Sequence, residues 1–383
     1  MKLSKLSVAL CASVAGVAIG AASAQSSAPG YTPPKTSWGA PDLQGTWTNA
    51  SITDMQRTAD YPNLVMTPAE VKKMEGDDYY NNRTREDAKR ADPKDTRLLD
   101  GTDLLSGGGY NAFWVDPGTK VAQVKGTYRS SWIVDPPNGQ IPRKGASGRP
   151  AAAPAPAAAP AGPRPNGGAS RSGTVQGPGP VDRNAGGGFG SYDNPETRPM
   201  GERCIIGFGN TGGPVMTNVL YNNHYQLVQT PANVLILIEM VHDARVIPIV
   251  KDKAEADKRL AAGRLQKWLG DSAGWYEGDT LVVETKNVMP AQRGYIGKDG
   301  MLTERFTRWD DKQILYEFTV DDPAQYTQPW RGEIALNWSK EPFYEYACHE
   351  GNYALSGILA GARKQEREGK TVRANAAEEG RGN

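Results

Sequence analysis

The stretch that most constrains the fold is Asn222–Pro248, in which two β-rich runs flank the four residues Thr230–Asn233. Proline at the second position of such a turn, followed by apolar residues, predicts a β-hairpin. With the two central turn residues as the loop, His224 lies opposite Glu239 on the neighbouring strand. A slip of one residue in this register would send every side chain to the other face.

Alternation along this hairpin separates its two faces. The first face is expected to carry Tyr225, Leu227, Ile236, Ile238, Met240 and His242. The second is expected to carry His224, Gln226, Leu237, Glu239 and Val241. The chain of 383 residues has only 3 histidines, and two of them lie here. The hairpin is therefore an apolar sheet segment with a polar cluster set into it.

Further β-patterns occur on both sides of the hairpin. Glu277-Gly278-Asp279 predicts a tight turn between strands at 274–276 and 280–285. A meander is expected at 302–309, 313–321 and 330–338, and shorter strands at 113–115, 131–134, 202–206 and 343–350. Regular antiparallel strands separated by turn signals predict a mainly β fold, either an antiparallel β-barrel or a strongly curved sheet. Gly45-Thr46-Trp47 resembles the first strand of lipocalin-like barrels.

A few peripheral helices are expected around this sheet. Thr67-Pro68-Ala69-Glu70 is a capping box with proline at the first helical position, so one or two surface helices should follow it to about residue 92. A second helix is expected at 254–265, and Asn352 should cap a terminal helix.

The first 24 residues read as a secretory signal. Two lysines precede an apolar run, and Ala22-Ser23-Ala24 is a small-residue cleavage site. Cleavage would leave Cys204 and Cys348 as the only cysteines, in a periplasmic or secreted compartment where disulfides persist. We therefore expect a Cys204–Cys348 disulfide; the alternative is two buried thiols.

Composition and charge bear on domains and partners. Residues 25–142 form the N-terminal part of the β domain, and 195–363 form its main part with the terminal helix. Residues 143–194, rich in Ala, Pro and Gly, are expected to be a disordered insertion, and 364–383 a disordered tail. The net charge of +1 gives no field that would attract nucleic acid, and no segment after the signal is apolar enough for a membrane helix. A small-molecule ligand or substrate is the expected partner.

Several strings resemble a large, uncharacterised family of exported bacterial proteins. They are Asp42-Leu43-Gln44-Gly45-Thr46-Trp47, Ile133–Gly139, Tyr221–Pro248, Trp268–Thr285, Glu304-Arg305-Phe306, Thr319–Pro323 and Tyr344–Gly361. Together they cover most of the chain outside the 143–194 insertion, which departs from the family pattern in length and composition. The resemblance assigns no activity and no catalytic residue.

Histidines with neighbouring carboxylates are the candidate reactive groups, because a carboxylate orients an imidazole for acid–base chemistry near neutral pH. The candidate catalytic residues are His242, His349, Glu350 and Glu239. The candidate substrate-binding residues are His224, Asp243, Arg245, Arg305 and Tyr353. His242 is expected at the end of an apolar strand, where the sheet passes from the core to the mouth of a cavity. His349 is a candidate neighbour of His242. The alternative is that both histidines have a purely structural role.

Other chemistries fit the sequence less well. A zinc site built from all three histidines is the minor alternative to a site without cofactor, because no short metal-ligand spacing occurs. A serine nucleophile is not expected, because no strand-to-helix turn with a Gly-x-Ser-x-Gly elbow is predicted. Two functions remain: a periplasmic lyase, isomerase or hydrolase that acts on a small molecule or sugar derivative in a barrel pocket, or a non-catalytic barrel that carries an apolar or aromatic compound.

Overall fold

The predicted hairpin is present, with the predicted register. A computed structural model describes residues 27–87, 116–144, 194–198, 200–201, 203–207, 215–263, 265–289, 295–297 and 299–369. Within it, β5 (His224–Gln229) and β6 (Asn233–Ile238) pair antiparallel, with Gln229 opposite Val234. The Glu239 N–H donates to the His224 carbonyl at 3.0 Å, which continues the ladder to the predicted His224–Glu239 pair.

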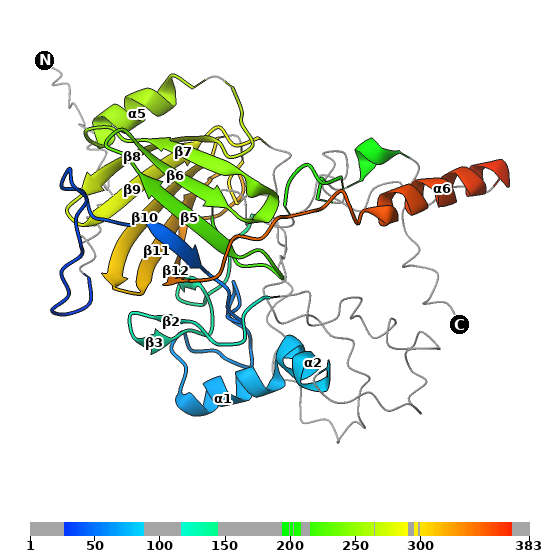
Figure 1. Ribbon diagram of the computed structural model, residues 1–383, viewed down its shortest axis with the longest axis horizontal. Helices are drawn as coiled ribbons and strands as arrows, with labels where there is room; N and C mark the ends of the chain where they lie inside the picture. Colours follow the sequence, from blue (N-terminus) through cyan, green and yellow to red (C-terminus); the bar gives the residue numbers. More distant parts are fainter. Residues whose placement is uncertain are drawn as a thin grey trace, which may run out of the picture.

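These two strands belong to a large antiparallel sheet that curves into a nearly closed barrel (Figure 1). The order along the sheet is β7-β6-β5-β1-β12-β11-β10-β9-β8, and β4 pairs with β12. The remaining strands of the sheet are β1 (Gly45–Thr48), β4 (Ile133–Asp135), β7 (Ala244–Pro248), β8 (Asp271–Glu277), β9 (Thr280–Lys286), β10 (Met301–Asp310), β11 (Gln313–Asp321) and β12 (Trp330–Trp338). The two end strands meet where Val250 N–H donates to the Gly274 carbonyl at 2.8 Å. The expected mainly β, barrel-like fold is confirmed.

Segments on both sides of the insertion contribute to this one sheet. β1 lies between β5 and β12, and β4 pairs with β12, although β1 and β4 precede residue 143. A separate hairpin of β2 (Gln123–Val124) and β3 (Thr127–Tyr128) packs beside β12. The chain before the insertion is thus part of the same core as the chain after it.

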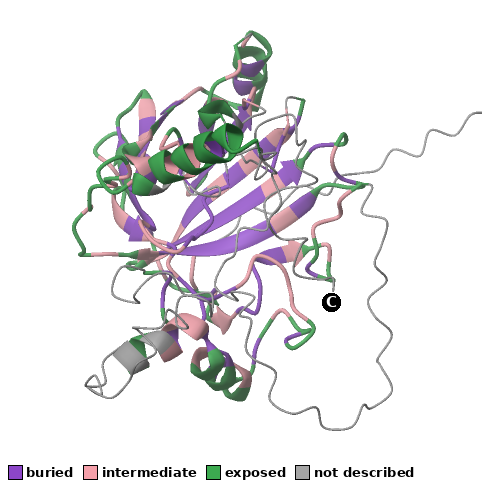
Figure 2. Cartoon of the chain, turned by 90° about the vertical axis from the view of Figure 1, so that its right-hand side faces the viewer, coloured by how far each residue is buried: buried purple, intermediate pink, exposed green. Residues whose placement is uncertain are grey.

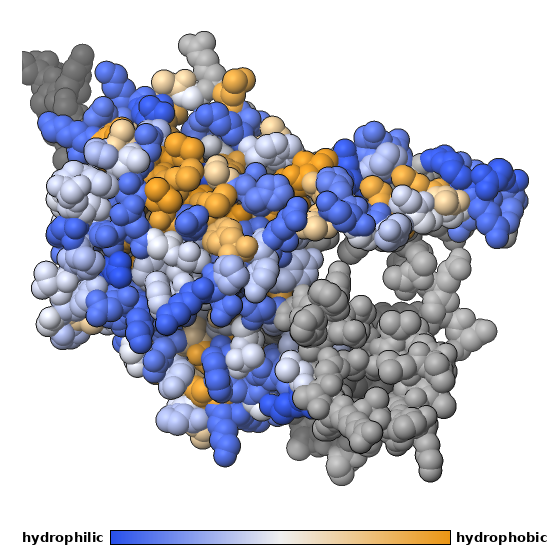
Figure 3. Space-filling model, in the orientation of Figure 1, coloured by the Kyte–Doolittle hydropathy of each residue, from blue (hydrophilic) through white to orange (hydrophobic). Residues whose placement is uncertain are grey.

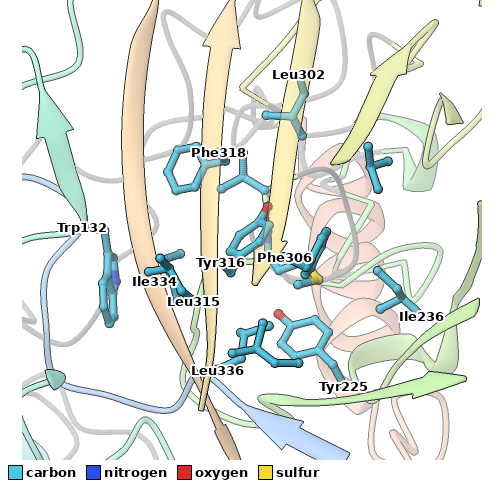
Figure 4. Close-up of a cluster of buried hydrophobic side chains, with 14 of the residues drawn as sticks. Trp132, Tyr225, Ile236, Leu302, Phe306, Leu315, Tyr316, Phe318, Ile334 and Leu336 are labelled. Carbon is cyan, nitrogen blue, oxygen red and sulfur yellow. Dashed lines mark hydrogen bonds between the residues drawn. The ribbon is translucent and has the colours of Figure 1, made fainter. Parts of the chain in front are cut away.

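Most of the core lies inside the barrel, on one face of the strands, and Leu315 on the opposite face of β11 belongs to the same buried cluster (Figures 2 and 4). Alternation on β11 is as expected: Ile314, Tyr316, Phe318 and Val320 are all buried inside. Phe318 lies directly opposite Gly332, where a Cβ atom would stand 2.2 Å from the phenyl ring. Glycine is therefore required at that position, because any side chain would displace the ring.

Helices lie at the periphery. They are α1 (Pro68–Asp77), α2 (Tyr79–Asp87), α5 (Lys253–Ala261) and α6 (Tyr353–Arg367), with 3-10 turns η2 (Pro195–Thr197) and η3 (Met240–His242). The predicted capping box is present at α1: the Thr67 side chain accepts from the Glu70 N–H, and the Glu70 carboxylate accepts from the Thr67 N–H. In the part of the chain described, no helix has the length and apolarity that crossing a bilayer requires.

The chain between β12 and α6 is not the strand predicted at 343–350. We call Ser339–Cys348 the C-terminal strap; it has no regular secondary structure and crosses the start of β5 on its way to α6, which projects from the barrel (Figure 1). Alternating tyrosines predict a strand here, but 343–350 pairs with no strand of the described part of the chain. The Cys204–Cys348 disulfide is present and ties the strap to the 203–207 segment.

Four further expectations need correction. Residues 203–206 form a turn, with Cys204 at φ 55°, and not a strand. Strand β6 ends at Ile238, so His242 lies in a turn with φ 47° and does not continue the strand. Arg143 and Lys144 are ordered beside Tyr326 and Gln325, and α6 continues past residue 363 to Arg367. The strand expected at 113–115, the signal, residues 145–193 and the end of the tail lie outside the described residues.

Candidate functional site

The His224 imidazole is the centre of a buried chain of hydrogen bonds on the outer face of the barrel. Its Nδ1 atom lies 3.0 Å from Oε2 of Glu239. Its Nε2 atom lies 3.0 Å from Oγ of Ser339, the first residue of the C-terminal strap. His224 is 6% exposed and Glu239 is 2% exposed, so the contact between them lies away from bulk water, whereas the Ser339 hydroxyl is partly exposed. A serine, an imidazole and a carboxylate are therefore joined in series through both ring nitrogens.

Three chain segments build this cluster. His224 begins β5, and Glu239 directly follows β6, so the hairpin register alone brings the two together. Ser339 follows the last residue of β12, and its N–H donates to the Thr46 carbonyl of β1 at 2.9 Å. Strand β1 separates β5 from β12 in the sheet. The bond to Thr46 holds Ser339 on the far side of this short strand, within reach of His224 at the start of β5.

Backbone donors complete the hydrogen bonding. The Tyr344 N–H donates to Oε1 of Glu239 at 2.9 Å, and the His224 N–H donates to Oε2 at 3.2 Å. The Glu341 N–H donates to the Ser339 hydroxyl at 3.1 Å. Burial raises the pKa of Glu239, but the donors from His224 and Tyr344 outweigh it, so that pKa lies below its ordinary value. Glu239 is thus held as the carboxylate that can orient and stabilise a charged imidazole.

A second polar cluster lies inside the barrel. Arg245 forms a bidentate ion pair with Glu304, with its Nη1 atom 3.0 Å from Oε1 and its Nη2 atom 2.6 Å from Oε2. The Tyr316 hydroxyl donates to the same Oε1 at 2.8 Å, and burial together with the Glu304 charge holds the pKa of Tyr316 well above its ordinary value. The sequence prediction had Arg245 bind substrate; its guanidinium instead neutralises a carboxylate in the core. That is the arrangement a buried charge requires.

A third cluster forms a row on the outer face of the sheet. Arg305, Glu317 and Glu333 stand directly opposite one another on β10, β11 and β12. Lys125 lies 2.9 Å and Arg129 3.0 Å from the Glu333 carboxylate. These contacts fasten the β2–β3 hairpin to the sheet. Arg305, a predicted substrate-binding residue, forms an ion pair with Glu277, with Nη1 2.9 Å from Oε2.

The other predicted site residues do not converge. His242 is exposed and Asp243 is partly buried in the turn after β6. His349 and Glu350 are exposed just after the strap, and Tyr353 begins α6 with an exposed fraction of 83%. His242 therefore does not end a strand as expected, because the chain leaves the sheet after Ile238. Among the described residues, no group of three or more His, Cys, Asp and Glu side chains is arranged to hold a metal ion.

Sequence reasoning found two members of the buried chain and missed the third. The His224–Glu239 pairing follows from a short hairpin, so local register is enough to predict it. Ser339 is 115 residues away from His224 and has no motif around it. Only the order of strands in the sheet reveals that contact.

Comparisons with known proteins add no relative to this description. No family model matches the chain, and neither the curated proteins nor the solved structures contain a significant match.

Proposed function

We propose that the protein is an exported hydrolase of the acyl-transfer type, with Ser339 as nucleophile, His224 as general base and Glu239 as the residue that orients the imidazole. The observation that supports this is the series of two 3.0 Å contacts, one at each ring nitrogen of His224. This is the arrangement by which a base activates a hydroxyl while a carboxylate fixes the imidazole tautomer. The one Gly-x-Ser-x-Gly string, Gly270–Gly274, runs into strand β8 and not over a turn into a helix. Ser339 needs no such elbow, because triads of this kind recur on unrelated folds.

The proposed reaction has two balanced steps. First, Oγ of Ser339 bonds to the carbonyl carbon of an ester, and its proton passes to Nε2 of His224. The carbon–oxygen bond to the alcohol then breaks, and the alcohol leaves with that proton. Second, water attacks the acyl-enzyme, gives its proton to His224, and releases the carboxylic acid while Ser339 recovers its hydroxyl proton. Glu239 stays ionised throughout and stabilises the imidazolium formed in each step.

The surroundings favour an ester with an apolar or aromatic part. Trp338 directly precedes the nucleophile and is 44% exposed, and Tyr344 of the strap is 61% exposed. The Phe343 ring lies 6.5 Å from the imidazole, centroid to centroid. Aromatic side chains beside a partly exposed hydroxyl give an acyl or aryl group a surface to pack on.

A structural role predicts a different outcome from the same contacts. The chain from Ser339 through His224 to Glu239 also fastens the C-terminal strap to β5, so each substitution is expected to lower stability by about 1–3 kcal/mol in either case. Turnover and melting temperature must therefore be measured together on each variant.

The experiment uses hydrolysis of p-nitrophenyl butyrate and covalent labelling by a fluorophosphonate. We expect Ser339→Ala to abolish labelling and His224→Gln to lower kcat/KM at least about 100-fold, the usual contribution of a positioned acid–base group. Glu239→Gln should also lower kcat/KM, and the double variant Ser339→Ala/His224→Gln should be no worse than Ser339→Ala, because the residues act as a unit. Ser356→Ala, an exposed serine on α6, is the matched control.

Three results would reject the proposal. They are labelling at a serine other than Ser339, equal turnover in Ser339→Ala and the parent protein, or loss of turnover in His242→Asn and His349→Asn with His224→Gln unaffected. The last result would restore the acid–base assignment made from sequence.

A further inference from the structure

A groove lies at the seam of the barrel, away from the Ser339 cluster. It is formed by β7, α5 and the chain that enters β8, and its volume is about 620 Å³. Its lining includes Val246, Glu255, Lys258, Arg259, Lys267 and Asp271. This volume is within the range of about 300–1,000 Å³ that small-molecule sites occupy.

The charges of the groove leave cations without partners. Asp271 is neutralised by Lys267 at 2.5 Å and accepts from the Asn287 side chain at 3.1 Å. The Glu255 carboxylate accepts from the Lys251 N–H at 3.0 Å. Lys258 and Arg259, on the groove side of α5, are exposed, and within the described residues neither side chain makes an ion pair. Glu255 keeps its charge, because its donor is a backbone amide, so the lining carries a net charge of +1, with Lys258 and Arg259 open to an anionic group.

An apolar row extends from one wall of the groove. Val246 of β7 is directly opposite Leu235 of β6, which is directly opposite Val228 of β5. Val246 is 59% exposed and Val228 is 38% exposed, and Leu235 is partly exposed between them. At about 4.8 Å between neighbouring strands, the row is roughly 10 Å long. Figure 3 shows apolar surface over these strands on the face that it presents.

The position of the row in the fold makes it unusual. Single exposed apolar residues are common on soluble proteins, but a row of three on adjacent strands that joins a lined groove indicates a binding surface. The groove supplies cations, and the row that leads away from it supplies apolar side chains. This arrangement matches a ligand that has one anionic end and a flexible apolar chain.

We propose that this groove and row bind a long-chain organic anion, a straight-chain carboxylate or sulfate, as a single molecule. The anionic end lies between Lys258 and Arg259, and the chain lies along Val246, Leu235 and Val228. The site contains none of Ser339, His224 and Glu239, so this proposal does not rest on the hydrolase proposal. Its readout is binding, which succeeds or fails independently of ester turnover.

Isothermal titration calorimetry with decanoate, butanoate and octyl glucoside, each below its micelle concentration, tests the assignment. Decanoate should bind saturably with one site per chain, and butanoate much more weakly because it lacks the chain. Lys258→Gln/Arg259→Gln should weaken decanoate binding about tenfold or more. Val246→Asn should weaken it by a similar factor, since about one valine side chain of apolar burial is lost.

Lys72→Gln/Arg367→Gln is the matched control, because it removes the same two charges from exposed positions on α1 and α6. This control variant should bind decanoate with the same affinity as the parent protein. The proposal is overturned if this control weakens binding as much as the groove variant does, or if octyl glucoside binds as tightly as decanoate. It is also overturned if decanoate does not saturate and the protein binds only phosphatidylglycerol vesicles, which would make the surface a membrane contact.

Discussion

At the scale of single residues, Glu317 shows how burial and neighbours set a charge. It lies between Arg305 and Glu333 in the row across β10, β11 and β12, and its Oε2 atom is buried without a hydrogen-bond partner. Burial raises the pKa of Glu317; the Glu333 charge raises it further, and Lys125 lowers it only in part. Ionisation of Glu317 is thus harder in the folded protein than in the unfolded chain.

This shift predicts a pH-dependent gain from Glu317→Gln. A raised folded pKa contributes stability that is complete below the ordinary value of 4.5 and is lost as pH rises through the folded pKa. Glutamine does not titrate, so the variant escapes this loss. The melting temperature of the variant minus that of the parent should therefore be larger at pH 8 than at pH 4.

Glu277→Gln is the control for this experiment. Burial raises the pKa of Glu277, but donors from Trp275 and Arg305 outweigh it and lower that pKa overall. This variant should therefore lose stability relative to the parent as pH rises from acid to neutral. The same trend with pH in both variants would contradict the assignment.

At the scale of elements, the C-terminal strap depends on contacts at its two ends. Ser339 and Tyr344 fasten its start to β5 and β6 through the His224–Glu239 pair, and Cys348 fastens its end to Cys204. The strap has no ladder of its own, so the disulfide replaces strand pairing as the restraint on its end.

Removing the disulfide should therefore loosen the strap more than the barrel. We expect Cys204→Ser/Cys348→Ser to cost about 2–5 kcal/mol of folding stability. Hydrogen exchange should quicken most at the Tyr344 amide, while amides of β10, β11 and β12 keep most of their protection. Uniformly faster exchange would mean that the bridge supports the barrel as a whole.

At the scale of the whole molecule, the sheet is assembled from both sides of the 145–193 segment. Asn194 caps η2 on one side, and on the other the Lys144 N–H donates to the Gln325 carbonyl at 2.8 Å. The junctions are therefore anchored to structured parts of the chain.

This arrangement predicts that the segment is replaceable. A linker of Gly and Ser in place of 145–193 should change folding stability by only about 1 kcal/mol, because loop closure costs about 0.6 kcal/mol per doubling of length. A deletion that also removes Arg143 and Lys144 is the control, and it should be less stable because the Gln325 contact is lost. Equal melting temperatures for the two deletions would contradict the anchoring role of Arg143 and Lys144. A large drop in melting temperature on replacement of 145–193 alone would show that this segment supports the fold.

The sequence by itself determined the local pairings. Proline in a four-residue turn and strict alternation of apolar residues set the β5–β6 register, the β8–β9 turn and the β10–β12 meander, because each depends on residues close together in the chain. The His224–Glu239 pair belongs to this class. A lone pair of cysteines in an expected export compartment was likewise enough to predict the bridge.

Only the tertiary structure decided which distant elements meet. Placement of β1 between β5 and β12 brings Ser339 to His224, and closure of the barrel at β7 and β8 forms the groove beside α5. His242 lies in a turn and 343–350 pairs with no strand of the described residues, although both have strand-like sequences. Such contacts depend on the order of strands in the sheet, and periodicity along a single strand carries no information about that order.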